Sequence, residues 1–178
     1  MVLEVPPPRE SCRIKVISMG EPNVGKSCLI KRYCEEKFVT KHVVTIGIDF
    51  GVKPVQVNGE AVKVNFFDMA GANHYRDIRV EFYKDAQGVL LVFDLCNKAT
   101  FDALEGWLVE AEANGLRTPA MVLCGNKLDN KKRQVEEKDA KKWAAAHNCI
   151  AYFETSAKEG NNVKSMFETL FAKVVAMR

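Results

Sequence analysis

Long apolar runs, a strong excess of one charge and paired cysteines are all missing from this sequence of 178 residues. The longest purely apolar run, residues 89–93, is far shorter than the roughly 20 residues that a membrane-spanning helix needs. Subtracting the 23 acidic from the 26 basic side chains leaves a net charge of +3, too small to indicate a protein that coats nucleic acid or anionic lipid. We therefore expect neither a transmembrane segment nor a nucleic-acid partner.

The cysteines and histidines are scattered and form no recognisable motif. No two of the six cysteines form a CxxC pair, and the three histidines show no zinc-ligand spacing with them. Such cysteines fit free thiols in a reducing compartment. The first ten residues contain three prolines where a signal peptide would need an apolar stretch. We expect an intracellular, cytosolic protein with a disordered tail over residues 1–11 and one folded domain over residues 12–178.

Short β-branched runs alternate with amphipathic segments of helical length, which predicts an α/β fold with helices covering a mostly parallel sheet. Asn58-Gly59 predicts a tight hairpin between the second and third strands. We therefore expect a six-stranded mixed sheet with one antiparallel strand, flanked by about five helices. The expected strands are 13–19, 47–57, 61–67, 87–94, 120–125 and 150–154, and the expected helices are 26–36, 77–84, 100–113, 136–147 and 162–177.

A phosphate-binding loop follows the first expected strand. The segment Gly20-Glu21-Pro22-Asn23-Val24-Gly25-Lys26-Ser27 matches the GxxxxGK[ST] pattern, whose backbone N–H groups cradle phosphate at a helix N-terminus. Lys26 would bridge β- and γ-phosphate oxygens, and the Ser27 hydroxyl would bind Mg²⁺. Pro22 has no N–H, so residues 23 to Cys28 would supply the cradle. The competing interpretation is a glycine-rich turn with an accidental Lys-Ser.

A base-binding motif follows the fifth expected strand. Asp129, in Asn126-Lys127-Leu128-Asp129, could accept hydrogen bonds from guanine N1–H and the 2-amino group, whereas adenine would leave this carboxylate unpaired. Asn126 could tie the base to the phosphate loop, and the Lys127 stem could cover one ring face. Taken alone, the motif also fits a polar turn. The Thr155-Ser156-Ala157-Lys158 segment follows the sixth strand and would bring the Ala157 N–H to guanine O6.

A metal and γ-phosphate motif ends the third expected strand. Asp68 could hold Mg²⁺ through a water molecule, and the Gly71 N–H could meet a γ-phosphate. The Thr45 hydroxyl could complete the metal shell, although Thr45 alone also fits a β-branched residue entering a strand. Loops ordered by Mg²⁺ and γ-phosphate, and released without them, would form a binary switch.

Together these motifs resemble, in order and spacing, the Ras superfamily of small GTPases, with its P-loop NTPase fold, over about residues 13–177. TIGIDF (45–50) and EFYKDAQGVLLVFD (81–94) resemble the Rab branch, while RIKVISMG, GKSCLIKRYCEEKF and FDMAG are most similar to the RBJ group, Rab-like proteins that carry a C-terminal J domain. The resemblance implies that GTP or GDP binds with Mg²⁺ and that Phe38 packs on the guanine.

The resemblance further implies two partner-binding segments, switch I at about 38–50, marked by Thr45, and switch II at 68–82. An effector protein would bind them, an exchange factor and an activating protein would regulate the cycle, and the protein would be a monomer. Lys26, Thr45 and Gly71 would handle the phosphates during hydrolysis. Met69 and Phe67 stand where Rabs usually have threonine and tryptophan, so an effector that recognises those Rab positions would be expected to discriminate against this chain.

The largest departure from the family is Ala72, which stands where most Rab and Ras proteins have the glutamine that orients the attacking water. A methyl group neither donates nor accepts a hydrogen bond, so we expect slow hydrolysis. One alternative is a GTP-locked scaffold that does not hydrolyse; another, a P-loop enzyme using ATP, is disfavoured by Asp129. No cysteine follows Cys149 and no HPD follows the last helix, so we expect neither a prenyl anchor nor a J domain in this chain.

Overall fold

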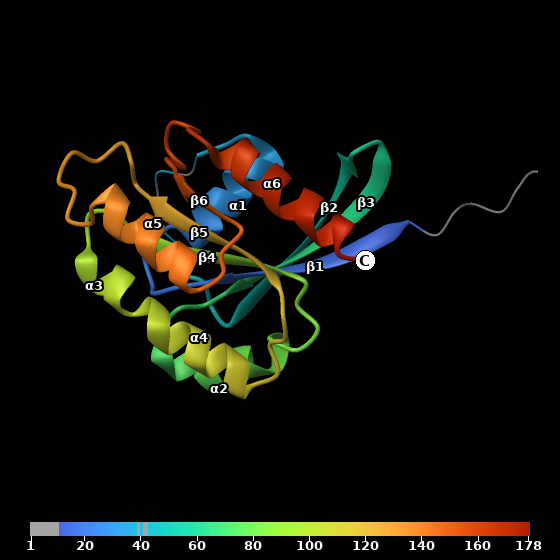
Figure 1. The fold of residues 1–178 in the computed structure, drawn as a ribbon, viewed down its shortest axis with the longest axis horizontal. Coiled ribbons are helices and arrows are strands. Elements are labelled where there is room, and N and C mark those ends of the chain that lie inside the picture. The colour runs from blue at the N-terminus through green and yellow to red at the C-terminus, as the bar shows by residue number, and fades with distance from the viewer. Residues whose placement is uncertain (1–10, 39, 41–42) are drawn as a thin grey trace, which may run out of the picture.

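A computed structural model describes residues 11–38, 40 and 43–178. Within them the chain forms one six-stranded sheet with the order β2-β3-β1-β4-β5-β6 (Figure 1). The strand β2 pairs antiparallel with β3, and the other neighbours are parallel, so the predicted mixed sheet is confirmed. Most of the predicted tail, residues 1–10, lies outside the described residues. The strands are β1 Cys12–Met19, β2 Ile48–Val57, β3 Glu60–Met69, β4 Gly88–Asp94, β5 Ala120–Asn126 and β6 Ala151–Glu154.

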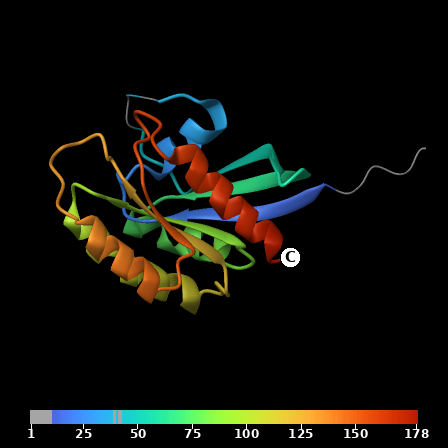
Figure 2. The same cartoon turned by 45° about the horizontal axis from the view of Figure 1, so that its top comes forward.

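Helices cover both faces of this sheet (Figures 1 and 2). One face packs against α1 and α6 and contains Ile14 and Val16 of β1. The opposite face packs against α4 and α5 and contains Ile17 and Met19 from the same strand. Adjacent side chains of a strand point to opposite faces, which explains the two cores. The helices are α1 Lys26–Glu35, α2 Arg76–Arg79, α3 Lys98–Asp102, α4 Leu104–Ala113, α5 Glu137–Ala146 and α6 Val163–Ala176.

The hairpin between β2 and β3 forms where Asn58-Gly59 predicted it. Both residues have positive φ angles, 49° and 80°, as a tight type I′ turn requires. The register pairs Val57 with Glu60 and continues to Ile48 opposite Met69. The hairpin therefore adds β2 as an antiparallel edge strand to an otherwise parallel sheet.

Two predicted helices differ from the structure. The helix expected at 77–84 is instead α2 flanked by 3₁₀ turns at Asn73–Tyr75 and Val80–Phe82, because no apolar stripe organises this segment and Ile78 is 49% exposed. The helix expected from residue 100 begins at Lys98, since the Asn97 side chain caps it by accepting from the Ala99 N–H. Only Ala103 separates α3 from α4, so five helical segments flank the sheet within the described residues.

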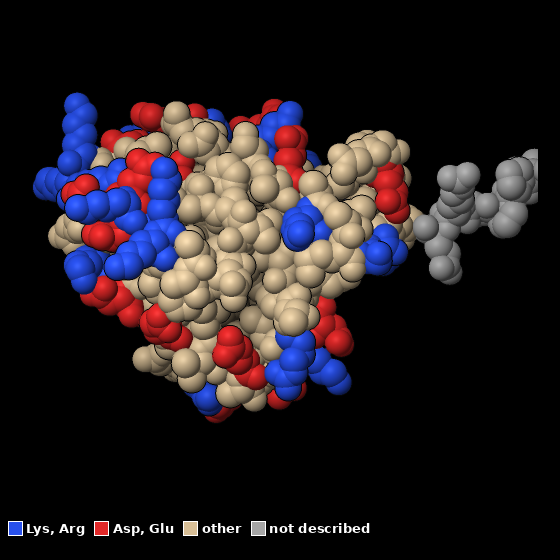
Figure 3. Space-filling view, in the orientation of Figure 1, with Lys and Arg blue, Asp and Glu red and all other residues tan. Residues whose placement is uncertain are grey.

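Charged side chains of both signs are interspersed on the surface. Figure 3 shows Lys and Arg alternating with Asp and Glu around the end of the molecule that carries α5, while the centre of that face is uncharged. All six cysteines lie in the described part of the chain and are free thiols. None of the helices in that part of the chain has the length and apolar character needed to cross a bilayer.

Candidate functional site

The predicted motifs meet at one edge of the sheet, where β1, β3, β5 and β6 end. Two cavities open there, one of about 70 Å³ beside the phosphate loop and Thr45, the other of about 230 Å³ beside Asp129 and Ala157. Asn23, Gly25 and Cys28 line both cavities, which makes them parts of one continuous site. Ligands of α/β proteins bind at this carboxyl edge, so the position agrees with a phosphate end and a base end of a single nucleotide.

The phosphate loop needs glycine at two positions. Gly20 has a φ of 144°, and a Cβ there would lie 2.2 Å from the Val92 carbonyl oxygen. Gly25 has a φ of 99°, and a Cβ there would lie 2.3 Å from Asn126 Nδ2. Directly after Gly25, α1 begins without a side-chain cap. Its first N–H groups are therefore available to bind an anion, as the motif predicts.

Lys26 lies buried beneath the loop and is 7% exposed. Its Nζ donates to the carbonyl oxygens of Gly20 and Glu21, both at 2.7 Å. Burial lowers the pKa of this ammonium to about 8, although the charges of Asp68 and Glu21 oppose the shift. A phosphate anion in the adjoining cavity would favour the charged form and strengthen the contact.

Three oxygen-bearing side chains converge beside the phosphate cavity. Ser27 Oγ lies 2.8 Å from Thr45 Oγ1 and donates to the Asp68 carboxylate, which also accepts from Ser18 Oγ at 2.9 Å. Burial raises the pKa of the Asp68 carboxyl, partly offset by these hydrogen bonds and by Lys26. Hard oxygen donors around a buried carboxylate fit Mg²⁺, which would favour the ionised form. The predicted metal residues are therefore brought together.

At the base end, hydrogen bonds fix the two motifs to each other and to the phosphate loop. Asn126 Nδ2 donates to the Val24 carbonyl oxygen at 2.9 Å, and Thr155 Oγ1 donates to Asn126 Oδ1 at 3.0 Å. Asp129 Oδ1 accepts from Ser156 Oγ at 2.7 Å. Asn126 thus joins the base end to the phosphate end, as expected. Thr155 opens the predicted motif after β6 but was not itself predicted as a site residue, and its hydroxyl holds the Asn126 amide.

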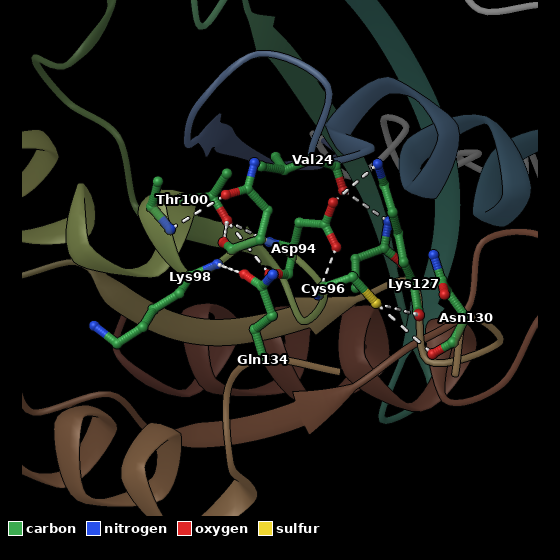
Figure 4. A network of polar contacts seen from close by, with 11 residues as sticks. Val24, Asp94, Cys96, Lys98, Thr100, Lys127, Asn130 and Gln134 are labelled. Carbon is green, nitrogen blue, oxygen red and sulfur yellow. Dashed lines mark hydrogen bonds and ion pairs between the residues drawn. The ribbon is translucent and has the colours of Figure 1, made fainter. Parts of the chain in front are cut away.

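The base cavity has aromatic, aliphatic and polar walls. Lys127 lines it with a φ of 67°, and its Nζ pairs with Asp94 Oδ2 at 3.1 Å. Asp94 Oδ1 in turn accepts from the Cys96 N–H at 2.8 Å (Figure 4). This carboxylate at the end of β4 is a further residue that the motifs did not predict, and it fixes the direction of the Lys127 stem. The same cavity is lined by Phe38, Thr40, Asn130, Ala157 and Lys158.

The remaining predicted residues divide between the cavity wall and the layer behind it. Pro22, Gly71 and Ala72 line the phosphate cavity. The Glu21 side chain turns away and accepts from Trp107 Nε1 at 3.0 Å, so this residue offers the site only its backbone. Val24 is fully buried and contributes its carbonyl oxygen to Asn126 (Figure 4). Lys31, Val43 and Val44 also line the phosphate cavity, and none of them was predicted as a nucleotide-binding residue, although Val43 and Val44 lie within the expected switch I.

Comparison with known proteins agrees with this arrangement. A family model described as the Ras family matches residues 15–176. DnaJ homolog subfamily C member 27 is 48% identical to the chain over 173 residues in Gallus gallus and over 174 in Homo sapiens. In both comparisons the match covers 94% of this chain and 63% of the relative. The Danio rerio relative is 47% identical over 176 residues, which are 95% of this chain and 64% of the relative.

The chain therefore spans somewhat less than two thirds of the length of these curated relatives. Their names class them as DnaJ homologues, which agrees with the resemblance to Rab-like GTPases that carry a J domain. The family match extends over nearly the whole described domain, including every motif of the nucleotide site. On this evidence, the chain belongs to the Ras family of small GTPases.

Proposed function

We propose that this domain binds GDP and GTP with Mg²⁺ and acts as a switch whose GTP state decays slowly. The observation that carries the proposal is the convergence of Lys26, the Ser27–Thr45–Asp68 group and Asp129 on two joined cavities. The first would bind phosphate, the second would hold a divalent cation, and the third would select the base. A glycine-rich turn alone would not bring these three chemistries together.

Guanine selection rests on Asp129. The Ser156 hydroxyl occupies one side of its Oδ1 and fixes the carboxylate at the base cavity. Guanine would donate to this carboxylate from N1–H and from the 2-amino group, and each such charged hydrogen bond is worth about 1.5–3 kcal/mol. Adenine lacks both donors, so it would be disfavoured by at least about 100-fold.

The phosphate end would neutralise charge with Lys26 and with the cation. Mg²⁺, when bound, would supply charge stabilisation between the β- and γ-phosphate oxygens. Ser27 and Thr45 come from α1 and from the segment before β2, so both hydroxyls can meet one ion only when switch I lies against α1. Thr45 is therefore the residue that would link the presence of the triphosphate to the position of switch I.

Slow hydrolysis rests on Ala72, which lines the phosphate cavity with a methyl group. Ras proteins that retain the glutamine hydrolyse GTP without help at only about 10⁻⁴ per second. Without a side chain that orients water, turnover would be slower still. Ala72 also favours the second candidate function, a GTP-locked interaction scaffold whose state depends on synthesis and nucleotide exchange.

Effector binding would use the apolar surface beside Thr45. Val43, Val44 and Ile46 are 66%, 58% and 79% exposed, and Phe50 on β2 is 55% exposed. The Phe50 ring packs 5.0 Å from the Phe67 ring, continuing this apolar surface across the sheet edge. Patches of this kind mark protein interfaces, and switches I and II would supply this one.

We also propose a cytosolic monomer under the control of an exchange factor and an activating protein; the six free thiols favour a reducing compartment.

Single-turnover hydrolysis tests the proposal. Protein preloaded with GTP and Mg²⁺ is followed for the native chain and for Ala72→Gln, with Ala113→Gln on the exposed side of α4 as the control. We expect Ala72→Gln to hydrolyse GTP at least about tenfold faster than the native chain, because it restores a group that can orient water. Equal rates would contradict the assigned role of Ala72, and failure of the native chain to load guanine nucleotide would overturn the proposed function.

A further inference from the structure

Gly71 is pressed against the phosphate loop in a way that no other residue type could reproduce. A Cβ at this position would lie 2.5 Å from the Pro22 backbone nitrogen and 2.6 Å from both the Glu21 carbonyl carbon and the Gly20 oxygen. These contacts are with backbone, which cannot move aside as a flexible side chain could. The start of switch II therefore rests directly on the loop that would hold the phosphates.

Arg79 holds this contact from behind. Its Nη1 donates to the Ala72 carbonyl oxygen at 2.9 Å and to the Ala70 carbonyl oxygen at 3.3 Å. These two carbonyls flank Gly71 on either side. The Arg79 side chain is only 2% exposed, so one buried guanidinium fixes both neighbours of the glycine.

A carboxylate and an aromatic ring fix Arg79 in turn. Its Nε and Nη2 donate to Glu110 Oε1 and Oε2 at 2.7 and 2.9 Å, a bidentate pair. The guanidinium carbon also lies 4.3 Å from the centre of the Trp107 ring. Burial opposes the charge, but the hydrogen bonds and the charge of Glu110 outweigh it and raise the pKa of the Arg79 guanidinium. Arg79 therefore stays charged and anchored to α4.

Trp107 completes a closed ring of contacts between the phosphate loop, α4 and switch II. Its Nε1 donates to Glu21 Oε1 at 3.0 Å, so α4 contacts the phosphate loop as well as switch II. The path runs from Glu21 to Trp107, to Arg79, to the carbonyls beside Gly71, and through Gly71 back to the phosphate loop. Every contact in this ring is made by the protein itself. Thr45 is also held within the protein, by one hydrogen bond to Ser27, but that bond lies at the proposed metal position, where both hydroxyls would instead bind the ion.

We propose that Arg79 is a positioning residue that holds residues 70–72 on the phosphate loop in both nucleotide states, so that the nucleotide-dependent change is largely confined to switch I. The inference rests on the proposed function and specifies how the same site is regulated. It follows that a partner distinguishing the two states would do so at residues 43–50. The backbone at Ala72 would stay at the phosphate cavity even with GDP bound.

Hydrogen exchange of the full chain tests this inference, with GDP and Mg²⁺ or with a non-hydrolysable GTP analogue and Mg²⁺. In the native chain, we expect the exchange rates of amides 71–79 to differ by less than about twofold between the GDP state and the analogue state. The exchange rates of amides 43–47 should differ by more than about tenfold between the same two states. In Arg79→Ala, amides 71–79 should exchange at least about tenfold faster with GDP. Binding of the analogue should restore part of this protection. In Arg79→Lys, amides 71–79 should exchange at rates between those of the native chain and those of Arg79→Ala.

Arg76→Ala is the matched control, because Arg76 lies in the same short helix but is exposed. It should leave both segments unchanged in both states. A structural loss alone would accelerate exchange equally with GDP and the analogue, so the difference between the two states separates positioning from simple destabilisation. If Arg79→Ala does not fold, Trp107→Phe keeps an aromatic ring in the core but removes the bond to Glu21 and part of the ring on which Arg79 packs, and it should speed exchange at 71–79 with GDP by about two- to threefold.

Two outcomes overturn the inference. In one, amides 71–79 of the native chain lose protection with GDP as strongly as amides 43–47 do. In the other, neither Arg79→Ala nor Trp107→Phe changes exchange at residues 71–79. Both results would leave nucleotide binding intact. If instead the native chain bound neither nucleotide in calorimetry, the proposed function would fail, and the two failures are thereby distinguished.

Discussion

At the base end of the site, Asn126 and Asp129 are each fixed by a hydrogen bond from the loop after β6, whereas at the switch I end Thr45 reaches Ser27 through a single hydroxyl contact. Residues on either side of Thr45 are more than half exposed, and Asn126 is 2% exposed. The base end is therefore built before any ligand arrives. The arrangement of the switch I end depends on what binds there. The base end would therefore recognise the nucleotide, and the switch I end would respond to it.

Gly25 is where the two ends join, so its replacement gives the largest expected effect. In Gly25→Ala, the new Cβ would lie 2.3 Å from Asn126 Nδ2 and displace the amide that connects the two ends. We expect affinity for GDP and for GTP to fall by more than about 100-fold in calorimetry.

Gly115→Ala is the matched control for this substitution. Gly115 has the same φ of 99°, but the nearest atom to its Cβ would be 3.6 Å away in Lys84. Both variants carry a similar backbone strain of about 1 kcal/mol, and only one lies in the site. Equal affinities for the two variants would show that the junction at Gly25 does not matter.

Asp129→Asn tests the base end alone. Losing the carboxylate should lower guanine-nucleotide affinity by about 100-fold, because two charged hydrogen bonds are weakened. Xanthine nucleotides should gain affinity, since the donors and acceptors on their altered edge suit an amide better. Asp102→Asn, at an exposed pair with Lys98, is the control and should change neither affinity. An equal loss for guanine and xanthine nucleotides would indicate local unfolding instead of altered recognition.

The sequence motifs predicted where the base end lies but not which side chains hold its residues in place. The segments at residues 20–27 and 126–129 are local patterns, and their strand-to-helix setting predicted where they would meet. Thr155 and Asp94 fix Asn126 and Lys127, yet neither role was predicted: Thr155 opens the motif after β6 without an assigned contact, and Asp94 is the last residue of β4. Their partners lie about 30 residues away along the chain, so only the folded sheet shows these contacts.

The same limit applies more strongly near switch II. Arg79 meets Glu110 across 31 residues, and Trp107 meets Glu21 across 86. Contacts between residues so far apart leave no periodic pattern in the sequence. The contacts of Arg79 were therefore not predicted, and the segment was expected to form an ordinary helix over residues 77–84. The buried polar contacts of Arg79 hold it instead as a short α-helix between two 3₁₀ turns. In contrast, the strands follow β-branched runs and were predicted to within about two residues of their observed ends.

Thr45→Ala tests the switch I end. Removing one hydroxyl contact should cost about 1 kcal/mol, so affinity for a GTP analogue with Mg²⁺ should fall by about fivefold to tenfold. Affinity for GDP should change by less than about twofold, because Thr45 would respond to the γ-phosphate region. Thr155→Ala is the comparison at the base end and should weaken both nucleotides equally. A Thr45→Ala variant that weakened both nucleotides equally would remove the distinction between the two ends.

Acid should loosen the switch II anchor, and this is the smallest expected effect. Burial favours the neutral form of Glu110, but the hydrogen bonds and charge of Arg79 and the Tyr83 hydroxyl lower its pKa below the ordinary 4.5. A carboxylate with a lowered folded pKa contributes stability that is complete above the unfolded value and is lost as the pH falls through the folded value. The Thr155–Asn126 hydrogen bond at the base end joins two neutral side chains and has no such dependence.

Urea unfolding of the native chain and Glu110→Gln at pH values from 7 to 3.5 measures this contribution. At neutral pH the native chain should be more stable by about 1.5 kcal/mol, since the glutamine side chain would keep the shape but not the charged hydrogen bonds. The difference should shrink steadily below about pH 4.5, as Glu110 takes up its proton. Glu137→Gln, at an exposed pair with Lys141, should show a much smaller pH-dependent change because solvent screens that pair. A constant difference between the native chain and Glu110→Gln at all pH values would mean that the charge of Glu110 does not hold Arg79, and that switch II is anchored by shape alone.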